Sequence, residues 1–362
     1  MIAPQHFHLL KAALWPPQEA LTFWRKWVAE RKFEASILEN PNVLPLLFDP
    51  VDAASQQLLP FVAQHLQHTD DPFVQKLKGN IRHHWLSNQY SLNQAQQICK
   101  IFQSINGQTL VLKNMAMSKG YYQNLEIQFS RDLDIAVRGI DRQTVIDTLT
   151  ATPFNLTLSA VEKSQIEYAS FTRFYDATTK KAVNIHWHLF QEYPSAGVDD
   201  LFWQNTSTLD LGAGVVSQVL RPIYQLFYTL VHGLYKPAHL SVSWVADAVF
   251  LIKNEKIDWS VILDLTKKLK YATAFQAALP LLKTEFGADI SDEVCTKMAS
   301  LPSSKAERCY FEQAITFTKP RDVIGYGQRN FWLYEAYLKY HSKTQKPFLV
   351  WFLSKVLKRL LA

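Results

Sequence analysis

Two aspartates stand one residue apart in the segment FSRDLDIAVRG, at positions 132 and 134. In a β-strand alternate side chains point to the same face, so Asp132 and Asp134 share one face while the apolar residues between and after them share the other. Two such carboxylates, roughly 6–7 Å apart, repel each other, and water, a cationic side chain or a divalent metal ion offsets that repulsion. Because we place both carboxylates at the surface, we expect each to contribute little to stability.

A second segment, VNIHWHLF, repeats this alternation, since Asn184, His186 and His188 are separated by apolar residues. If the two strands are neighbours, Asn184 or His186 can meet the Asp pair over one face. Magnesium favours one or two carboxylates together with substrate phosphates, which this set supplies. Upstream, Lys113 stands where LVLKN turns from a strand into a helix, a place that suits a polyphosphate.

The apolar pattern divides the chain into three parts. Spacings of three and four residues predict helices throughout 1–105, one of them starting at a Ser91 cap. The middle part, 106–215, mixes strand and helix signals, and helices return in 216–362, beginning with VSQVLRPIYQLF. We therefore predict an α+β fold in which a small mixed β-sheet core is flanked by N-terminal and C-terminal helical regions.

Within the middle part, short apolar and alternating segments predict the strands that hold the polar residues. TLVL indicates a short buried strand, DLDIAV a second strand, and DRQTVIDTLTA a helix with Asp141 as its N-cap. The segments YASFTRFYD and AVNIHWHLF are separated by the polar residues ATTKK and predict a hairpin. The second strand of this hairpin is the one that carries Asn184.

Composition narrows the class of protein but does not select an activity. The formal charge of +6 and the pI near 9.0 modestly favour anionic partners such as nucleotides, nucleic acid or acidic lipid. The three cysteines are widely spaced and lack metal-ligand spacing, which indicates reduced cytosolic thiols. No apolar run has the length of a membrane span and the first residues lack a secretory signal, so we expect a cytoplasmic protein. The basic amphipathic segment 346–362 could touch a membrane surface, although docking on its own protein is preferred.

The four segments LVLKNMAMSKGYY, FSRDLDIAVRG, VNIHWHL and LVHGLYKPAHLSVSWVADAVFLI occur in an order that resembles the uncharacterised nucleotidyltransferases of the DNA polymerase beta-like superfamily. The resemblance extends across most of the chain. It implies a nucleotidyltransferase core between helical regions and a magnesium-dependent transfer of NMP from an NTP to a hydroxyl acceptor. It also implies that Asp132 and Asp134 are catalytic residues that hold the metal.

The resemblance assigns further residues position by position. The family's phosphate-turn segment matches Leu112, Lys113 and Asn114, where Asn114 replaces a glycine. Ser130 and Arg131, the two residues directly before the Asp pair, are expected to bind the nucleotide together with Lys113 and Asn114.

The superfamily's third carboxylate aligns with Asn184, which can offer a metal an oxygen but neither a charge nor a proton acceptor. His186, on the same face, is the alternative base. The family's trailing helix motif matches Trp244 and Asp247, with His232 in the preceding helix.

Three readings of the chain remain open at this stage. The first is the nucleotidyltransferase, with an acceptor that is a small molecule, a protein or RNA. The second, supported by Asn114 and Asn184, is a catalytically degenerate module that binds a nucleotide or a partner. The third is a metallohydrolase that uses His186 and His188 with the Asp pair, which lacks further nearby His or Cys ligands.

Overall fold

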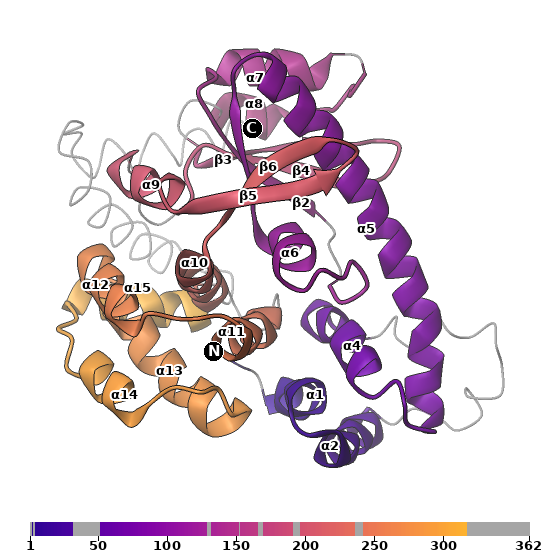
Figure 1. The fold of residues 1–362 in the computed structure, drawn as a ribbon, viewed down its shortest axis with the longest axis vertical. Helices are drawn as coiled ribbons and strands as arrows, with labels where there is room; N and C mark the ends of the chain where they lie inside the picture. The colour runs from indigo at the N-terminus through magenta and orange to yellow at the C-terminus, as the bar shows by residue number, and fades with distance from the viewer. Residues whose placement is uncertain are drawn as a thin grey trace. The chain divides into compact units, whose positions relative to one another are not determined.

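The computed structural model describes residue 2 and residues 4–31, 51–128, 132–151, 153–165, 169–190, 196–235 and 242–316 (Figure 1). These residues pack into two compact units, each assembled from separate stretches of the chain. The helical unit lies within Met1–Gln89, Met117–Phe129 and Pro222–Phe317. The described part of the sheet unit lies within Tyr90–Ala116 and Ser130–Arg221.

A six-stranded mixed sheet forms the centre of the sheet unit, with the strand order β3-β4-β2-β1-β6-β5. The pairs β2–β4 and β1–β6 are parallel, whereas β1–β2, β3–β4 and β5–β6 are antiparallel. The predicted α+β class with a small mixed sheet is therefore confirmed. The strands are β1 (Gln108–Val111), β2 (Asp132–Arg138), β3 (Phe171–Tyr175), β4 (Ala182–His186), β5 (Thr206–Gly212) and β6 (Val215–Leu220).

The strand that carries the Asp pair lies inside the sheet, with β1 on one side and β4 on the other. Its residues 133–137 are all buried, so this strand is covered on both faces. The predicted hairpin is also confirmed, because β3 and β4 pair antiparallel across the polar turn. The strands with the two sets of polar residues are thus hydrogen-bonded neighbours.

The last two strands of the sheet differ from the sequence prediction. Helix was expected from residue 216 onward, but Val215–Leu220 forms β6 and pairs with β5. Its burial alternates at first, with Val215, Ser217 and Val219 buried, which is the period of a strand. The helix α10 (Pro222–Leu234) begins at a proline, whose restricted φ and missing N–H suit the first turn of a helix.

One long helix, α5 (Pro72–Ser104), runs through Ser91, where the sequence predicted that a helix starts. Ser91 lies inside this helix, where it is buried and accepts a hydrogen bond from Lys181 Nζ at 2.7 Å. The prediction that Ser91 starts a helix is therefore wrong. Its hydroxyl accepts a hydrogen bond from a lysine of the sheet unit and does not cap a helix.

The last turns of α5 cover one face of the sheet. Cys99 is fully buried against Thr109 and Ser217. Thr109 of β1 pairs with Val137 of β2, so this is the face to which the apolar side chains of β2 point. The Asp pair therefore lies on the opposite face.

The remaining helices of the sheet unit are short. Asp141 caps α7 as predicted, because its Oδ1 accepts a hydrogen bond from the Thr144 N–H at 2.9 Å. Figure 1 shows α7 and α8 together on one side of the sheet and α6 on the other. These elements are α6 (Lys113–Met115), a π-helix (Ala116–Tyr121) that continues into the helical unit, α7 (Arg142–Thr150), α8 (Ala160–Gln165) and α9 (Ala196–Trp203).

The helical unit buries large aromatic side chains between its helices. Trp24 and Trp27 are fully buried and stack with ring centroids 5.4 Å apart. Besides the first part of α5, its helices are α1 (Pro4–Leu14), α2 (Pro17–Glu30), α4 (Ala53–His65), α10, α11 (Ser243–Asn254), α12 (Trp259–Leu269), α13 (Ala272–Phe286), α14 (Asp292–Ala299) and α15 (Lys305–Thr316).

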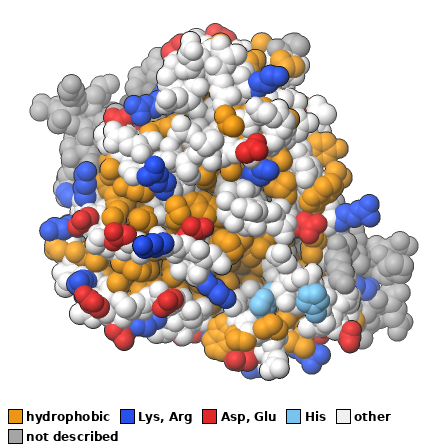
Figure 2. Space-filling view, viewed as in Figure 1, with side chains coloured by type: hydrophobic (Ala, Val, Ile, Leu, Met, Phe, Trp, Pro, Cys, Tyr) orange, Lys and Arg blue, Asp and Glu red, His pale blue; other side chains and the backbone are white. Residues whose placement is uncertain are grey.

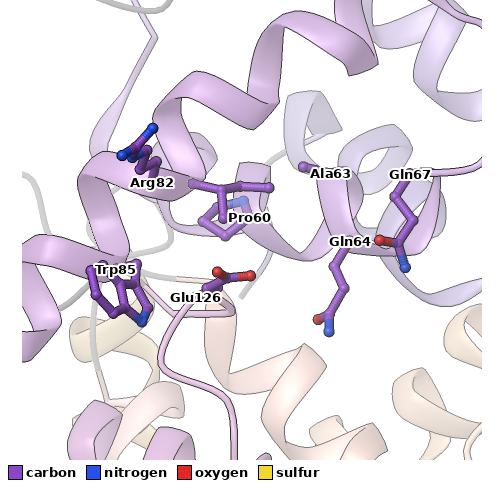
Figure 3. A pocket seen from close by; sticks show the side chains of 8 residues that line it. Pro60, Ala63, Gln64, Gln67, Arg82, Trp85 and Glu126 are labelled. Carbon is purple, nitrogen blue, oxygen red and sulfur yellow. The ribbon is translucent and has the colours of Figure 1, made fainter.

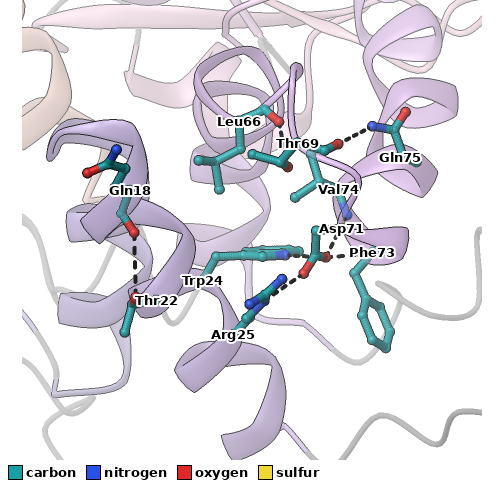
Figure 4. Close-up of polar contacts among 10 residues, drawn as sticks. All are labelled: Gln18, Thr22, Trp24, Arg25, Leu66, Thr69, Asp71, Phe73, Val74 and Gln75. Carbon is teal, nitrogen blue, oxygen red and sulfur yellow. Dashed lines mark hydrogen bonds and ion pairs between the residues drawn. The ribbon is translucent and has the colours of Figure 1, made fainter.

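The start of α5 is held by a buried carboxylate (Figure 4). Asp71 directly precedes the helix and is 7% exposed. Its oxygens accept hydrogen bonds from Trp24 Nε1 at 3.1 Å and Arg25 Nε at 3.2 Å, and from the N–H groups of Phe73 and Val74. One side chain therefore caps α5 and ties it to α2.

Charges of both signs are mixed on the face shown in Figure 2, where Lys and Arg stand among Asp and Glu. The positive net charge is thus not gathered there into one broad basic field. Among the described helices, none is both long enough and apolar enough to cross a bilayer. The basic segment 346–362 lies outside the described residues.

Asp71→Ala should lower the free energy of unfolding by about 1–3 kcal/mol, because it removes a helix cap and leaves the buried Trp24 N–H without its acceptor. Urea unfolding followed by circular dichroism measures this. The exposed neighbour provides the control, and Asp70→Ala should change stability by less than about 0.5 kcal/mol. Equal effects of the two variants would contradict the capping role.

Candidate active site

The strand register brings four of the predicted site residues together on one face of the sheet. β2 runs parallel to β4 with Asp134 opposite Asn184 and Ala136 opposite His186. Lys113 follows β1 at the start of α6, and the Leu112 N–H donates to the backbone oxygen of Asp134 at 3.0 Å. That backbone bond holds the start of α6 beside the carboxylate.

Asp134 is the common acceptor of this cluster. Its Oδ1 accepts hydrogen bonds from Lys113 Nζ at 2.5 Å, His186 Nε2 at 2.8 Å and Asn184 Nδ2 at 3.1 Å. The side chain of Asp134 is only 7% exposed. An ionised carboxylate only accepts hydrogen bonds, so His186 carries its proton on Nε2 in this arrangement.

The environment of Asp134 keeps it ionised. Burial alone would raise its pKa, but the charge of Lys113 and the hydrogen bond and charge of His186 outweigh burial. Together they hold the pKa of Asp134 well below its usual range. The expectation of two surface carboxylates is therefore wrong for Asp134, because its negative charge is buried and compensated.

Asp132 lies two residues before Asp134 on the same face of β2, and its side chain is more exposed to solvent. Both of its carboxylate oxygens lie near Arg173 Nη2, at 3.1 and 3.0 Å. Arg173 comes from β3 and is half exposed. Cationic side chains thus offset the repulsion that the sequence predicts between the two aspartates.

Arg173 belongs to this face and Lys181 directly precedes β4 near Asp132, and both were missed by the sequence analysis. Burial lowers the pKa of the Lys181 ammonium to about 8, although the negative charge of Asp132 acts in the opposite direction. Arg173 pairs across the hairpin with Asn184, so alternation along FTRFY together with the predicted hairpin could have placed it on this face. Lys181 gave no comparable signal, because its neighbour Ser91 comes from a distant helix.

The phosphate-turn segment has an unexpected backbone. Lys113 has a positive φ of 53°, the left-handed region that non-glycine residues seldom adopt. Asn114, which replaces the family's glycine, is inside α6 and is not among the positive-φ residues. The conformational freedom of glycine is therefore not required at position 114, and the strained residue is the lysine that reaches Asp134.

His188 does not join the cluster. β4 ends at His186, and His188 turns to Asp199, with Nδ1 2.6 Å from Oδ2. The alternation therefore stops before His188. Ser130 and Arg131 lie outside the described residues.

The oxygen atoms of the cluster fit a hard divalent cation such as magnesium. Besides the two carboxylates, Asn184 Oδ1 is a buried oxygen without a hydrogen-bond partner in the described structure, while its Nδ2 points to Asp134. Carboxylate and amide oxygens are ligands for such ions. In the described ranges, no group of three or more His, Cys, Asp and Glu residues is arranged to hold a metal ion.

Comparison with known proteins agrees with this arrangement. The profile of a family described as uncharacterised nucleotidyltransferase matches residues 52–287, nearly two thirds of the chain. The chain belongs to this family. No curated protein matches it significantly. The matched range contains the whole six-stranded sheet and the helices α10 and α11, so it covers both the Asp cluster and the helix motif that follows.

In this nucleotidyltransferase family member, the helix motif forms its own buried network in the helical unit. Trp244 lies against Gly233, where any side chain larger than hydrogen would collide with the indole. Asp247 accepts hydrogen bonds from the Tyr122 hydroxyl at 2.8 Å and from Gln128 Nε2. Burial raises the pKa of Asp247 to about 7, although both hydrogen bonds lower it.

Asp134→Asn should lower the free energy of unfolding by about 3 kcal/mol or more, because it leaves the half-buried charge of Lys113 uncompensated. Asp132→Asn should change it by less than about 1 kcal/mol, since Arg173 is exposed to solvent. Urea titration of both variants at neutral pH compares them directly. Similar stabilities for the two variants would show that Asp134 is not the anchor of the cluster.

Asp247 should make stability depend on pH. Its folded pKa is raised above the ordinary value of 3.8, so its contribution is complete below about pH 4 and is lost as the pH rises through about 7. Asp247→Asn cannot ionise and keeps an oxygen for Tyr122 and Gln128. Relative to the parent, this variant should gain on the order of 2 kcal/mol between pH 5 and pH 8 in urea unfolding. A constant difference over that range would refute the buried, titrating carboxyl.

Proposed function

We propose that the chain transfers a nucleoside monophosphate from a magnesium-bound NTP to a hydroxyl acceptor, with Asp132 and Asp134 as the metal ligands. The observation that carries this proposal is the buried, ionised Asp134, held beside Asp132 on one sheet face, with Lys113 paired to Asp134 and Arg173 to Asp132. A buried carboxylate kept charged is suited to bind a cation. Membership of the family supports nucleotidyl transfer as the class of reaction, but it does not identify the nucleotide or the acceptor.

Charge balance supports the binding of a triphosphate at this face. Lys113 and Arg173 each pair with one aspartate, and Lys181 stands near Asp132. In such a complex Asp132 and Asp134 would hold the magnesium ion, and Lys113 and Arg173 would bind phosphate oxygens. Each of these charges would then have a partner of opposite sign. Magnesium itself would supply neutralisation of the triphosphate and of the departing pyrophosphate.

The residues of the cluster then contribute mainly by positioning. Lys113 and Arg173 orient the phosphates, and Asn184 offers its buried oxygen to the metal. His186 carries its Nε2 proton toward Asp134, so we assign it to hold that carboxylate in place rather than to accept a proton through Nε2. Phosphoryl transfer depends chiefly on such positioning and on electrostatic stabilisation.

A catalytically degenerate binding module is the second candidate, and Asn184 favours it. Where the superfamily pattern places a third carboxylate, Asn184 donates a hydrogen bond to Asp134 and cannot activate a hydroxyl. Such a protein would bind the metal–nucleotide complex at the same face without releasing pyrophosphate. The metallohydrolase has less support, because His188 pairs with Asp199 rather than with the Asp pair.

Magnesium-dependent NTP binding should be lost or weakened about tenfold or more in Asp132→Asn, because one metal ligand loses its charge. Arg173→Ala should weaken binding of the same complex less strongly, through the loss of a phosphate contact. Equilibrium dialysis with each NTP, with and without magnesium, measures both effects, and pyrophosphate release separates enzyme from module. Asp147→Asn, on the exposed side of α7, is the matched control and should bind as the parent does.

Asn184→Asp tests the degenerate position. A third carboxylate facing Asp134 repels it, so the melting temperature should fall without magnesium and recover when magnesium is added. If the amide is what limits catalysis, pyrophosphate release should rise by about 10²-fold or more. Recovery of stability without any release of pyrophosphate favours the binding module, whereas no response to magnesium argues against a metal site at this face.

A further inference from the structure

A pocket of about 530 Å³ opens in the helical unit, where one face of α4 meets one face of α5 (Figure 3). Pro60, Ala63 and Gln64 of α4 line it at helical spacing, followed by Gln67 in the turn after that helix. Its volume is within the range of small-molecule sites. None of the residues that line it belongs to the Asp cluster.

The opposite wall carries the residues most suited to contact a ligand. Arg82 and Trp85 stand three residues apart on α5 and therefore share a helix face. Figure 3 shows both on one side of the pocket, with Gln64 and Gln67 on the other and Glu126 between the two walls. The Trp85 side chain is 41% exposed, unusual for a residue of this size.

The polar side chains that line this pocket have no protein partner in the part of the chain that the structure describes. Within the described residues, no hydrogen bond or ion pair involves the side-chain polar atoms of Gln64, Gln67, Arg82 or Glu126. Amide, guanidinium and carboxylate groups are planar and can each contact two neighbouring hydroxyls. The pocket thus combines an exposed aromatic face with several unused planar donors and acceptors.

Charge decides which class of ligand this combination fits. The lining has one cation, Arg82, and one anion, Glu126, so its formal charge is zero. A polyphosphate would meet the Glu126 carboxylate, and a polycation would meet the Arg82 guanidinium. A neutral ring with many hydroxyls avoids both conflicts, satisfies the amides and the carboxylate, and lays its C–H face on the negative face of the indole.

We propose that this pocket binds a neutral sugar, either a monosaccharide or one residue of a glycan, with Trp85 as the stacking platform. The inference goes beyond the proposed transfer reaction and is independent of it, because every residue involved belongs to the helical unit. For a single neutral sugar ring, the affinity expected from a ligand of this size is a dissociation constant of about millimolar.

Saturation-transfer NMR with the full chain and a panel of neutral methyl glycosides tests this proposal. At least one glycoside should bind, with its ring C–H protons saturated most strongly, and Trp85→Ala should reduce that binding by about tenfold or more. Leu86→Ala, which removes an exposed apolar neighbour outside the pocket, should leave it unchanged. Gln64→Ala should weaken binding, while the same ring C–H protons remain the most strongly saturated.

Three results would overturn the proposal. These are the absence of binding by every neutral glycoside, sugar binding that Trp85→Ala leaves intact, and binding only of inorganic phosphate or of a carboxylate probe through Arg82. Thermal unfolding of each variant establishes that it is folded. Binding of magnesium–NTP by Trp85→Ala should equal that of the parent, so failure of the sugar proposal and failure of the nucleotide proposal remain distinguishable.

Discussion

The site depends on one interaction, the acceptance of three hydrogen bonds by the Oδ1 atom of Asp134. This atom accepts from Lys113, which begins α6 directly after β1, and from Asn184 and His186 of β4. One carboxylate of β2 therefore links the segments on both sides of its strand. The negative charge is buried, and it is tolerated because a cation and two further donors compensate it. A chain that lost this carboxylate would lose the geometry of the face and, with it, the proposed metal site.

The same constraint explains how binding and stability are related at this face. The aspartates and the surrounding cations are matched in the described structure, with Lys113 on Asp134 and Arg173 on Asp132. In the proposed reaction, a magnesium–triphosphate complex would bring both signs of charge, so each aspartate and each cation would keep a partner of opposite sign. The positive φ of Lys113 fits this role, since strained backbone is found where a side chain must reach a particular place.

Much of this face follows from the sequence because strand alternation has a period of two. The polar residues of β2 and β4 could be assigned to one face, and the hairpin signal placed β3 beside β4. Other features depend on tertiary partners that periodicity does not reveal. Asp134 is buried together with its three donors, which come from other elements. The strand β6 resembled the start of the helix that follows it, because apolar residues recur in both segments. His188 left the cluster because β4 ends two residues before it.

The most direct test of the central claim is an NMR titration of the isotope-labelled chain with manganese and a non-hydrolysable NTP analogue. Manganese takes the same oxygen ligands as magnesium and broadens signals near its binding site. We expect selective loss of the backbone amide signals of Lys113, Asp134 and Asn184, with recovery after chelation, and no such loss in Asp132→Asn. Broadening confined to other residues, or unchanged signals at these three, would contradict a metal–nucleotide site built on Asp134.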